Sequence, residues 1–205
     1  MPDEMPFKEM EATLKKSVAA FREAEVPALL GGSLAVWARG GPETRHDLDF
    51  VVKPEDAERA LKALEDVGMR PEIPPEGWLY KAWDGDILVD VIFEPRGLVV
   101  DDALVARGEE REVMAIGIRL MALEDVFTSK LMALDEHSAD YSRLLLMARS
   151  LREQVDWQDI RERTRESAFA KAFFTLAEEL QVVPAADPTA PPAAAARARV
   201  RVVEG

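Results

Sequence analysis

Hydrophobic residues recur at helical spacing in the first part of the chain and then alternate with polar ones. Phe7, Met10, Leu14, Val18 and Phe21 predict an amphipathic helix over residues 7–25. A second helix is predicted from Pro54 to about Val67, and a short one over 34–39 with Ser33 as its N-cap. Short apolar runs predict strands at 28–30, 48–52, 78–83, 86–93 and 113–120. The two strands around Asp84-Gly85 are typical of a hairpin.

From Leu123 onward the pattern is helical only. Helices are predicted at 123–134, 141–152, 157–164 and 168–180. After Val183 the composition changes to one rich in Ala and Pro, which is typical of a flexible extension. We therefore expect an α/β (α+β) domain over residues 1–120, a helical subdomain over 121–183 and a flexible tail over 184–205.

Composition and charge exclude several classes of protein. The 205 residues carry 26 Lys and Arg against 39 Asp and Glu, a formal net charge of −13, which argues against coating nucleic acid through bulk charge. The absence of Cys excludes disulfides, thiol nucleophiles and Cys/His zinc clusters. Residues 1–10 lack the apolar core of a signal peptide, and no apolar run reaches the ~18–20 residues that span a bilayer. We expect a cytoplasmic protein with no membrane partner.

Three of the sixteen aspartates stand in strands that are otherwise apolar. Asp47 and Asp49 flank Leu48 at alternate positions, so both carboxylates are expected on one face of a strand. Asp90 is the one polar residue between Ile87 and Phe93, and an ionised carboxylate there is costly unless it is paired or bound to a metal. If the two strands are neighbours, the carboxylates converge on a site suited to two Mg²⁺ ions. The second Asp-x-Asp, at 84–86, is explained by its hairpin turn.

A Gly-Gly-Ser segment precedes these aspartates. Gly31, Gly32 and Ser33 lie between a predicted strand and a predicted helix, where glycines let backbone N–H groups approach a phosphate. Taken alone, the segment is typical of an ordinary strand-to-helix turn. Its value lies in the combination with Asp47-Leu48-Asp49, which follows after thirteen intervening residues, and with the lone Asp90 of a later strand.

This combination resembles the DNA polymerase β-like nucleotidyltransferase superfamily. The wider stretch from Leu29 to Leu151 is similar to a small bacterial branch near the MenT and AbiE-type nucleotidyltransferase toxins and the small antibiotic nucleotidyltransferases. The segments that carry this likeness are Arg45-His46-Asp47-Leu48-Asp49-Phe50-Val51-Val52, Leu123-Glu124-Asp125-Val126, Ser129-Lys130-Leu131 and Val155-Asp156-Trp157. The resemblance implies a polymerase β-like mixed sheet flanked by helices and followed by a helical bundle.

The resemblance also implies roles for individual residues. In the segment Gly31-Gly32-Ser33, Gly32 and Ser33 would hold the β- and γ-phosphates of an NTP. Asp47, Asp49 and Asp90 would bind Mg²⁺ in a two-metal site. Asp90 would also help to deprotonate the acceptor hydroxyl, whose oxygen displaces pyrophosphate from the α-phosphate. Positioning and charge neutralisation would supply most of the catalysis.

Three further residues are candidates for the nucleotide site. Lys130 lies close to the apolar stripe of its helix, and the resemblance implies that it contributes to the nucleotide site. The alternative is that its aliphatic stem packs on the core while its ammonium group reaches solvent. Arg45 stands where many members of the toxin branch carry Ser or Thr. Two interpretations are open: Arg45 contacts a phosphate of the nucleotide, or it is a solvated loop residue. Asp135 and Asp140 compete for the place of a later helical Asp, and we favour Asp140.

The acceptor stays open at this point. Seven basic residues between 141 and 171 would suit a tRNA 3′ end and a toxin with an antitoxin partner, although a solvated helix face explains them as well. The acidic body would suit a cationic antibiotic such as an aminoglycoside, and a lincosamide is a further possibility. A catalytically silent nucleotide-binding module is the third hypothesis, and the complete set of three aspartates argues against it.

Overall fold

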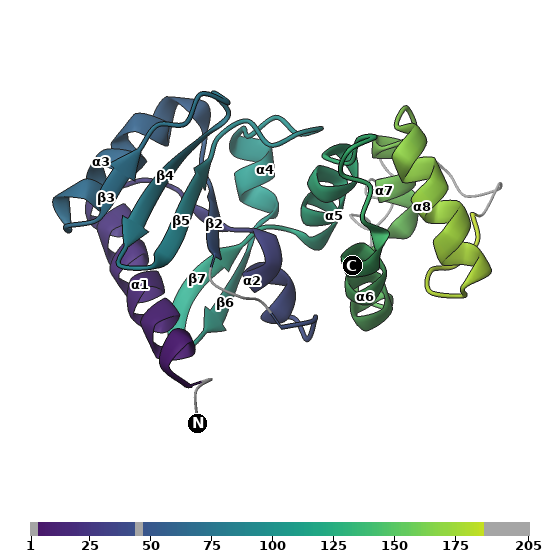
Figure 1. The fold of residues 1–205 in the computed structure, drawn as a ribbon, viewed down its shortest axis with the longest axis horizontal. Coiled ribbons are helices and arrows are strands. Elements are labelled where there is room, and N and C mark those ends of the chain that lie inside the picture. Colours follow the sequence, from purple (N-terminus) through teal and green to yellow (C-terminus); the bar gives the residue numbers. More distant parts are fainter. Residues whose placement is uncertain (1–3, 44–46, 187–205) are drawn as a thin grey trace, which may run out of the picture. The chain divides into compact units, whose positions relative to one another are not determined.

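The computed structural model describes residues 4–43 and 47–186. Contacts divide the chain into two compact units, Met1–Ala122 and Leu123–Gly205. The first unit contains helices and strands, whereas the second is helical (Figure 1). The predicted tail lies almost entirely outside the described residues. None of the helices within the described ranges combines the length and the apolar character needed to cross a bilayer.

Seven strands of the first unit form one mixed sheet within the described residues. Its order is β3-β4-β5-β2-β1-β7-β6, in which β2 is parallel to β5, β1 is parallel to β7, and the other neighbours are antiparallel. The strands are β1 (Leu29–Leu30), β2 (Asp47–Val51), β3 (Arg70–Glu72), β4 (Leu79–Asp84), β5 (Ile87–Ile92), β6 (Glu109–Val113) and β7 (Ile116–Leu120). A mixed sheet with flanking helices confirms the predicted α/β class.

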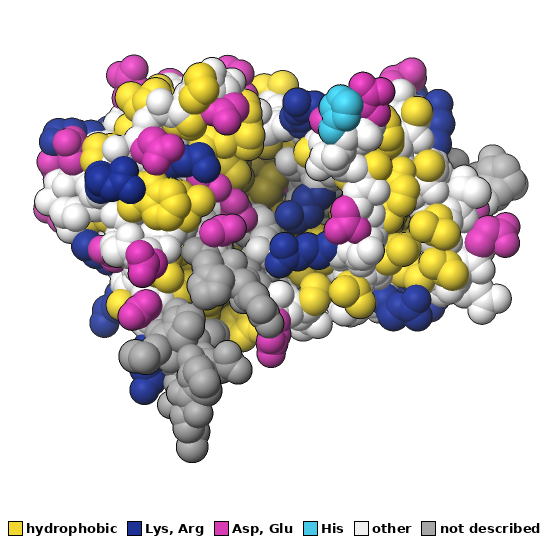
Figure 2. All heavy atoms as spheres, viewed as in Figure 1, with side chains coloured by type: hydrophobic (Ala, Val, Ile, Leu, Met, Phe, Trp, Pro, Cys, Tyr) yellow, Lys and Arg dark blue, Asp and Glu magenta, His cyan; other side chains and the backbone are white. Residues whose placement is uncertain are grey.

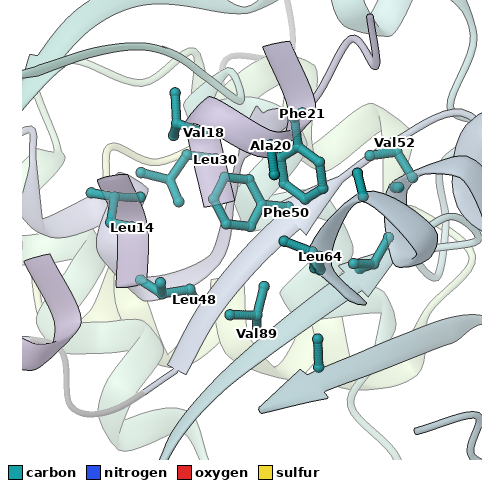
Figure 3. Close-up of a cluster of buried hydrophobic side chains, with 14 of the residues drawn as sticks. Leu14, Val18, Ala20, Phe21, Leu30, Leu48, Phe50, Val52, Leu64 and Val89 are labelled. Atoms are coloured by element: carbon teal, nitrogen blue, oxygen red, sulfur yellow. The ribbon is translucent and has the colours of Figure 1, made fainter. Parts of the chain in front are cut away.

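Two helices cover one face of this sheet. They are α1 (Glu4–Glu23) and α3 (Ala57–Asp66), which follows a short 3₁₀ turn at Pro54–Asp56 (Figure 1). Leu14 and Phe21 of α1 and Leu64 of α3 pack against Phe50 and Val89 of the sheet (Figure 3). The rings of Phe21 and Phe50 meet edge to face at 4.9 Å between centroids. Because side chains alternate along a strand, this core leaves the intervening residues of β2 and β5 on the opposite face.

Two short helices complete the first unit, and four helices form the second within the described range. The first two are α2 (Gly32–Trp37) and α4 (Asp102–Arg107). The others are α5 (Leu123–Met132), α6 (Tyr141–Leu151), α7 (Trp157–Arg163) and α8 (Ala168–Glu179). An aromatic cluster holds the second unit together, since the ring of Trp157 packs edge-on against Phe127 and Phe174.

The structure corrects four details of the sequence-based prediction. The predicted strand 113–120 is two strands, β6 and β7, joined by Met114 and Ala115, which both have positive φ. Helix α2 begins at Gly32 and its N-cap is Gly31, so the prediction of Ser33 as the cap was wrong. Strand β3 and helix α4 were not predicted, because neither carries a periodic apolar pattern.

Charges are spread over the surface. Acidic and basic side chains are interspersed on the visible face of each unit (Figure 2). Several exposed pairs are local, as between Lys62 and Asp66 on α3 or between Arg165 and Glu166 after α7. Such pairs contribute little to stability, and they account for much of the charged composition without a functional role.

Candidate active site

Asp47, Asp49 and Asp90 share one face of the sheet. Strands β2 and β5 are parallel neighbours, and their register places Asp49 beside Asp90 and Asp47 beside Leu88. Leu48 and Phe50, which alternate with the two aspartates of β2, are fully buried on the core side. Adjacent strands lie about 4.8 Å apart, so the carboxylates of Asp49 and Asp90 are close neighbours. The structure therefore brings together the three aspartates that the sequence singled out.

The carboxyl group of Asp90 is the most constrained of the three. Its side chain is only 18% exposed, and its Oδ1 atom is buried with no hydrogen-bond partner among the described residues. The pKa of Asp90 is raised from the ordinary 3.8 to about 6, chiefly by burial and then by the charges of Asp49 and Asp47, against the opposing effect of Lys81. A buried carboxylate facing two others is poised to take up a cation or a proton.

Gly32 packs directly on this carboxylate face. Its φ of +56° is a conformation that only glycine adopts readily, and a Cβ at this position would lie 1.6 Å from Asp49 Oδ2. The preceding Gly31 donates its N–H to the carbonyl of Asp49 at 2.7 Å. Ser33 is half-buried in the first turn of α2. The Gly-Gly-Ser segment is thus fixed against Asp49, which an ordinary strand-to-helix turn would not require.

Several solved structures have the same fold as this chain. The solution structure of the antibiotic-resistance factor ANT(2'')-Ia matches with a TM-score of 0.58 and 17% identity, over 86% of this chain and 97% of that one. A candidate nucleotidyltransferase from H. pylori matches with a TM-score of 0.54 and 17% identity, over 91% and 85%. A candidate nucleotidyltransferase from Thermotoga maritima, TM1012, matches with a TM-score of 0.50 and 18% identity, over 64% and 88%.

The chain has a nucleotidyltransferase fold. At these identities the likeness concerns the fold and leaves activity to be argued from the residues themselves. No protein-family model matches the sequence, and the comparison with curated proteins finds no match either.

The carboxylate face of this nucleotidyltransferase fold suits a divalent cation only with help from a ligand. Among the described residues, no group of three or more acidic or imidazole side chains could hold a metal ion by itself. Mg²⁺ is commonly bound by one or two carboxylates, with waters and substrate phosphates completing its octahedron. The Oδ1 atom of Asp90, which has no hydrogen-bond partner among the described residues, and the hard oxygen donors of Asp47 and Asp49 fit that mode of binding.

Burial of Asp90 predicts how the stability of the metal-free protein depends on pH. Because its pKa is higher in the folded than in the unfolded chain, its contribution is fully present below about pH 4 and is lost as the pH rises through 6. We expect a loss of about 2 kcal/mol over this window, allowing for partial exposure. Urea unfolding of wild type and Asp90→Asn in EDTA measures it, and the difference isolates this group. A difference that does not change between pH 4 and 7 contradicts the assignment.

The remaining predicted site residues lie outside the first unit or outside the described range. Arg45 falls in residues 44–46, which the structure does not describe. Lys130 is half-buried in the last turn of α5.

Asp140 is exposed and is the N-cap of α6, where its carboxylate accepts a hydrogen bond from the Ser142 N–H at 2.9 Å. That bond lowers the pKa of Asp140. Its competitor Asp135 accepts from the His137 N–H. The functional roles of Arg45, Lys130 and Asp140 stay predictions.

Sequence reasoning missed Lys81, which faces Asp90 from the neighbouring strand. The register of β4 and β5 pairs the two residues, and Lys81 Nζ lies 3.8 Å from Asp90 Oδ1. This distance is too long for a hydrogen bond, so the contact is an ion pair only. The hairpin pattern around Gly85 contained the signal, because the turn position determines which residue lies opposite Asp90.

A buried ion pair in the second unit was also missed. Arg163 of α7 forms ion pairs with two carboxylates. One belongs to Asp125, which is fully buried in α5, and the other to Asp159, whose Oδ2 atom lies 3.0 Å from a guanidinium nitrogen of Arg163. We expect Arg163→Met to lower the free energy of unfolding by about 2–4 kcal/mol, because the buried carboxylate of Asp125 would lose the counter-charge that Arg163 supplies. Chemical denaturation measures the loss, with Arg165→Met as the matched exposed control. Equal losses in the two variants would contradict a structural role for this pair.

Proposed function

We propose that the protein is a Mg²⁺-dependent nucleotidyltransferase, which moves a nucleoside monophosphate from an NTP to an acceptor hydroxyl. The observation that carries the proposal is the carboxylate face, on which Asp49 lies between Asp90 and the backbone of Gly32. Three neighbouring carboxylates repel one another, so this arrangement does not stabilise the fold. The nucleotidyltransferase fold supports the proposal.

In the proposed reaction, the aspartates would hold the metal and the Gly-Gly-Ser segment would hold the phosphates. Asp47, Asp49 and Asp90 would hold Mg²⁺, which when bound neutralises the phosphates and activates the α-phosphorus for attack. Gly32 and Ser33 would bind the β- and γ-phosphates within the Gly31-Gly32-Ser33 segment, where a side chain on Gly32 would collide with Asp49.

In the proposed reaction, Asp90 would take up the proton of the acceptor hydroxyl. As that proton leaves, the acceptor oxygen forms a bond to the α-phosphorus, and the bond from this phosphorus to the bridging oxygen breaks. Pyrophosphate departs with the electrons of the broken bond. A carboxylate whose pKa lies near 6 in the metal-free protein accepts a proton more readily than an exposed one.

Lys130, Arg45 and Asp140 would complete the nucleotide site. Lysine and arginine would contact phosphate, as their charge allows. Asp140 is already engaged as a helix cap, so a second role would require its remaining oxygen to reach the ligand. Single replacements that change the KM for NTP without changing thermal stability would support each of these assignments.

There are two candidates for the acceptor. The resemblance to the MenT and AbiE branch favours the 3′ end of a tRNA, with an antitoxin protein as partner. The second candidate is an aminoglycoside or a lincosamide antibiotic. ANT(2'')-Ia, whose fold this chain shares, has been solved in complex with adenylyl-2''-tobramycin. A net charge of −13 favours a polycationic acceptor over a polyanionic one.

Transfer of radioactive label separates these acceptors. The protein is incubated with each α-³²P-labelled NTP and Mg²⁺, together with total tRNA, an aminoglycoside panel or lincomycin. Label on tRNA supports the toxin hypothesis, and label on a drug supports the antibiotic one. EDTA and Asp49→Asn should each abolish the signal. Binding of an NTP without transfer to any acceptor would favour a catalytically silent module.

A further inference from the structure

Lys81 introduces a positive charge at the edge of the carboxylate face. It lies on β4, directly opposite Asp90 of β5, and the side chains of the two residues are 26% and 18% exposed. Asp90 therefore has acidic neighbours on β2, in Asp49 and Asp47, and a basic neighbour on β4. The ammonium group offsets part of the repulsion among the carboxylates.

The geometry of the ion pair is loose. Lys81 Nζ is 3.8 Å from Asp90 Oδ1, and this oxygen has no hydrogen-bond partner among the described residues. A lysine ammonium is a point charge on a flexible stem, so it can screen a carboxylate without fixing it in one geometry. A cation that binds Asp90 would approach the same oxygen and would be repelled by the ammonium at short range.

We propose that Lys81 is a positioning residue that compensates the charge of Asp90 in the metal-free protein and weakens the affinity of the carboxylate face for the catalytic cation. This inference rests on the proposed function. It assigns Lys81 two effects of opposite sign, one on stability without metal and one on metal affinity. A lysine with a merely structural role would not produce that combination.

The first effect is measured without metal by a double-mutant cycle. In EDTA at pH 7.5, Lys81→Met should lower the melting temperature by about 2–4 °C in the wild-type background, because the carboxylates lose their counter-charge. In the Asp90→Asn background the same replacement should change it by less than about 1 °C. Equal shifts in the two backgrounds would show that Lys81 acts through packing alone and would overturn the proposal.

The second effect is measured by titration with Mn²⁺ in the presence of a fixed, saturating concentration of an α,β-methylene NTP analogue, followed by electron paramagnetic resonance. Lys81→Met should bind Mn²⁺ roughly three- to tenfold more tightly than wild type, because the repelling charge is gone. Lys81→Arg should restore the wild-type affinity. Lys62→Met, which removes an exposed lysine from α3, should leave it unchanged.

The outcomes separate this inference from the proposed function. Unchanged or weaker Mn²⁺ binding by Lys81→Met overturns the inference, and so does a wild type that binds no Mn²⁺. The proposed function is judged by transfer of labelled nucleotide, which can succeed in either case. A protein that transfers label but whose Lys81→Met variant binds Mn²⁺ as wild type does would retain the function and lose the inference.

Discussion

Replacing Asp90 by Asn should lower the rate of the proposed nucleotidyl transfer by at least about a thousandfold and leave the fold intact. Asparagine has nearly the same shape, but it neither accepts the proton of the acceptor hydroxyl nor supplies a charged ligand to the cation, and each loss costs orders of magnitude in rate. The fold should tolerate the change, because an amide relieves the repulsion with Asp49. Initial rates and thermal melting are measured on the same preparation.

The second Asp-x-Asp motif supplies the matched control. Asp86 is an exposed acidic residue of the β4–β5 turn and belongs to no part of the carboxylate face. Asp86→Asn should retain the wild-type rate within about twofold, as expected for a surface change away from the site. If Asp90→Asn retained a tenth of the activity or more, Asp90 would be excluded both as a metal ligand and as the proton acceptor.

Replacing Gly32 by Ala is expected to abolish transfer as well, for a steric reason. The added Cβ would lie 1.6 Å from Asp49 Oδ2, so either the loop or the carboxylate must move. The substitution also carries the cost of a positive φ, about 1–2 kcal/mol. We expect a loss of transfer of at least about a hundredfold, because small displacements of positioned groups are expensive in rate.

Gly40→Ala separates the two effects. Gly40 has a φ of +89°, and an added Cβ there would meet no atom within 4 Å, so this variant bears only the backbone strain. It should lose about 1–2 kcal/mol of stability and keep its activity. If Gly32→Ala behaved in the same way, with activity retained, the contact between Gly32 and Asp49 would have no role in the site.

The core of the candidate site could be predicted because it depends on local alternation. Asp47 and Asp49 stand at period two in an apolar strand, and Asp90 interrupts another, so each had to lie on the face away from the core. That β2 and β5 are neighbours is a long-range fact. It followed only from the resemblance to a known superfamily, and the register of Asp49 with Asp90 bears it out.

Lys81 shows how sensitive such reasoning is to a single residue. With Asp84-Gly85 as the turn, the predicted strands begin and end so that Trp83 faces Asp86, and Leu79 would then face Asp90. The observed turn is Gly85-Asp86, where Asp84 pairs with Ile87 and Lys81 with Asp90. A glycine with positive φ at the first central position is typical of type II′ hairpins, so the correct register was accessible from the sequence.

The β6–β7 hairpin was beyond sequence reasoning for a different reason. Its turn residues, Met114 and Ala115, both have positive φ, which neither residue type favours. Nothing in the local sequence marks such a turn, and pairing with β1 through Leu30 and Leu120 fixes β7 in the sheet. The buried pair of Asp125 and Arg163 is likewise tertiary, since 38 residues separate its members.

The central claim is that Asp47, Asp49 and Asp90 bind a divalent cation together with a nucleotide. A crystal structure with Mn²⁺ and an α,β-methylene NTP analogue, analysed by anomalous scattering, tests it most directly. We predict an anomalous peak within about 2.3 Å of carboxylate oxygens from at least two of these aspartates, with the triphosphate beside Gly32 and Ser33. A nucleotide bound elsewhere, or no Mn²⁺ at these three aspartates, would contradict the account.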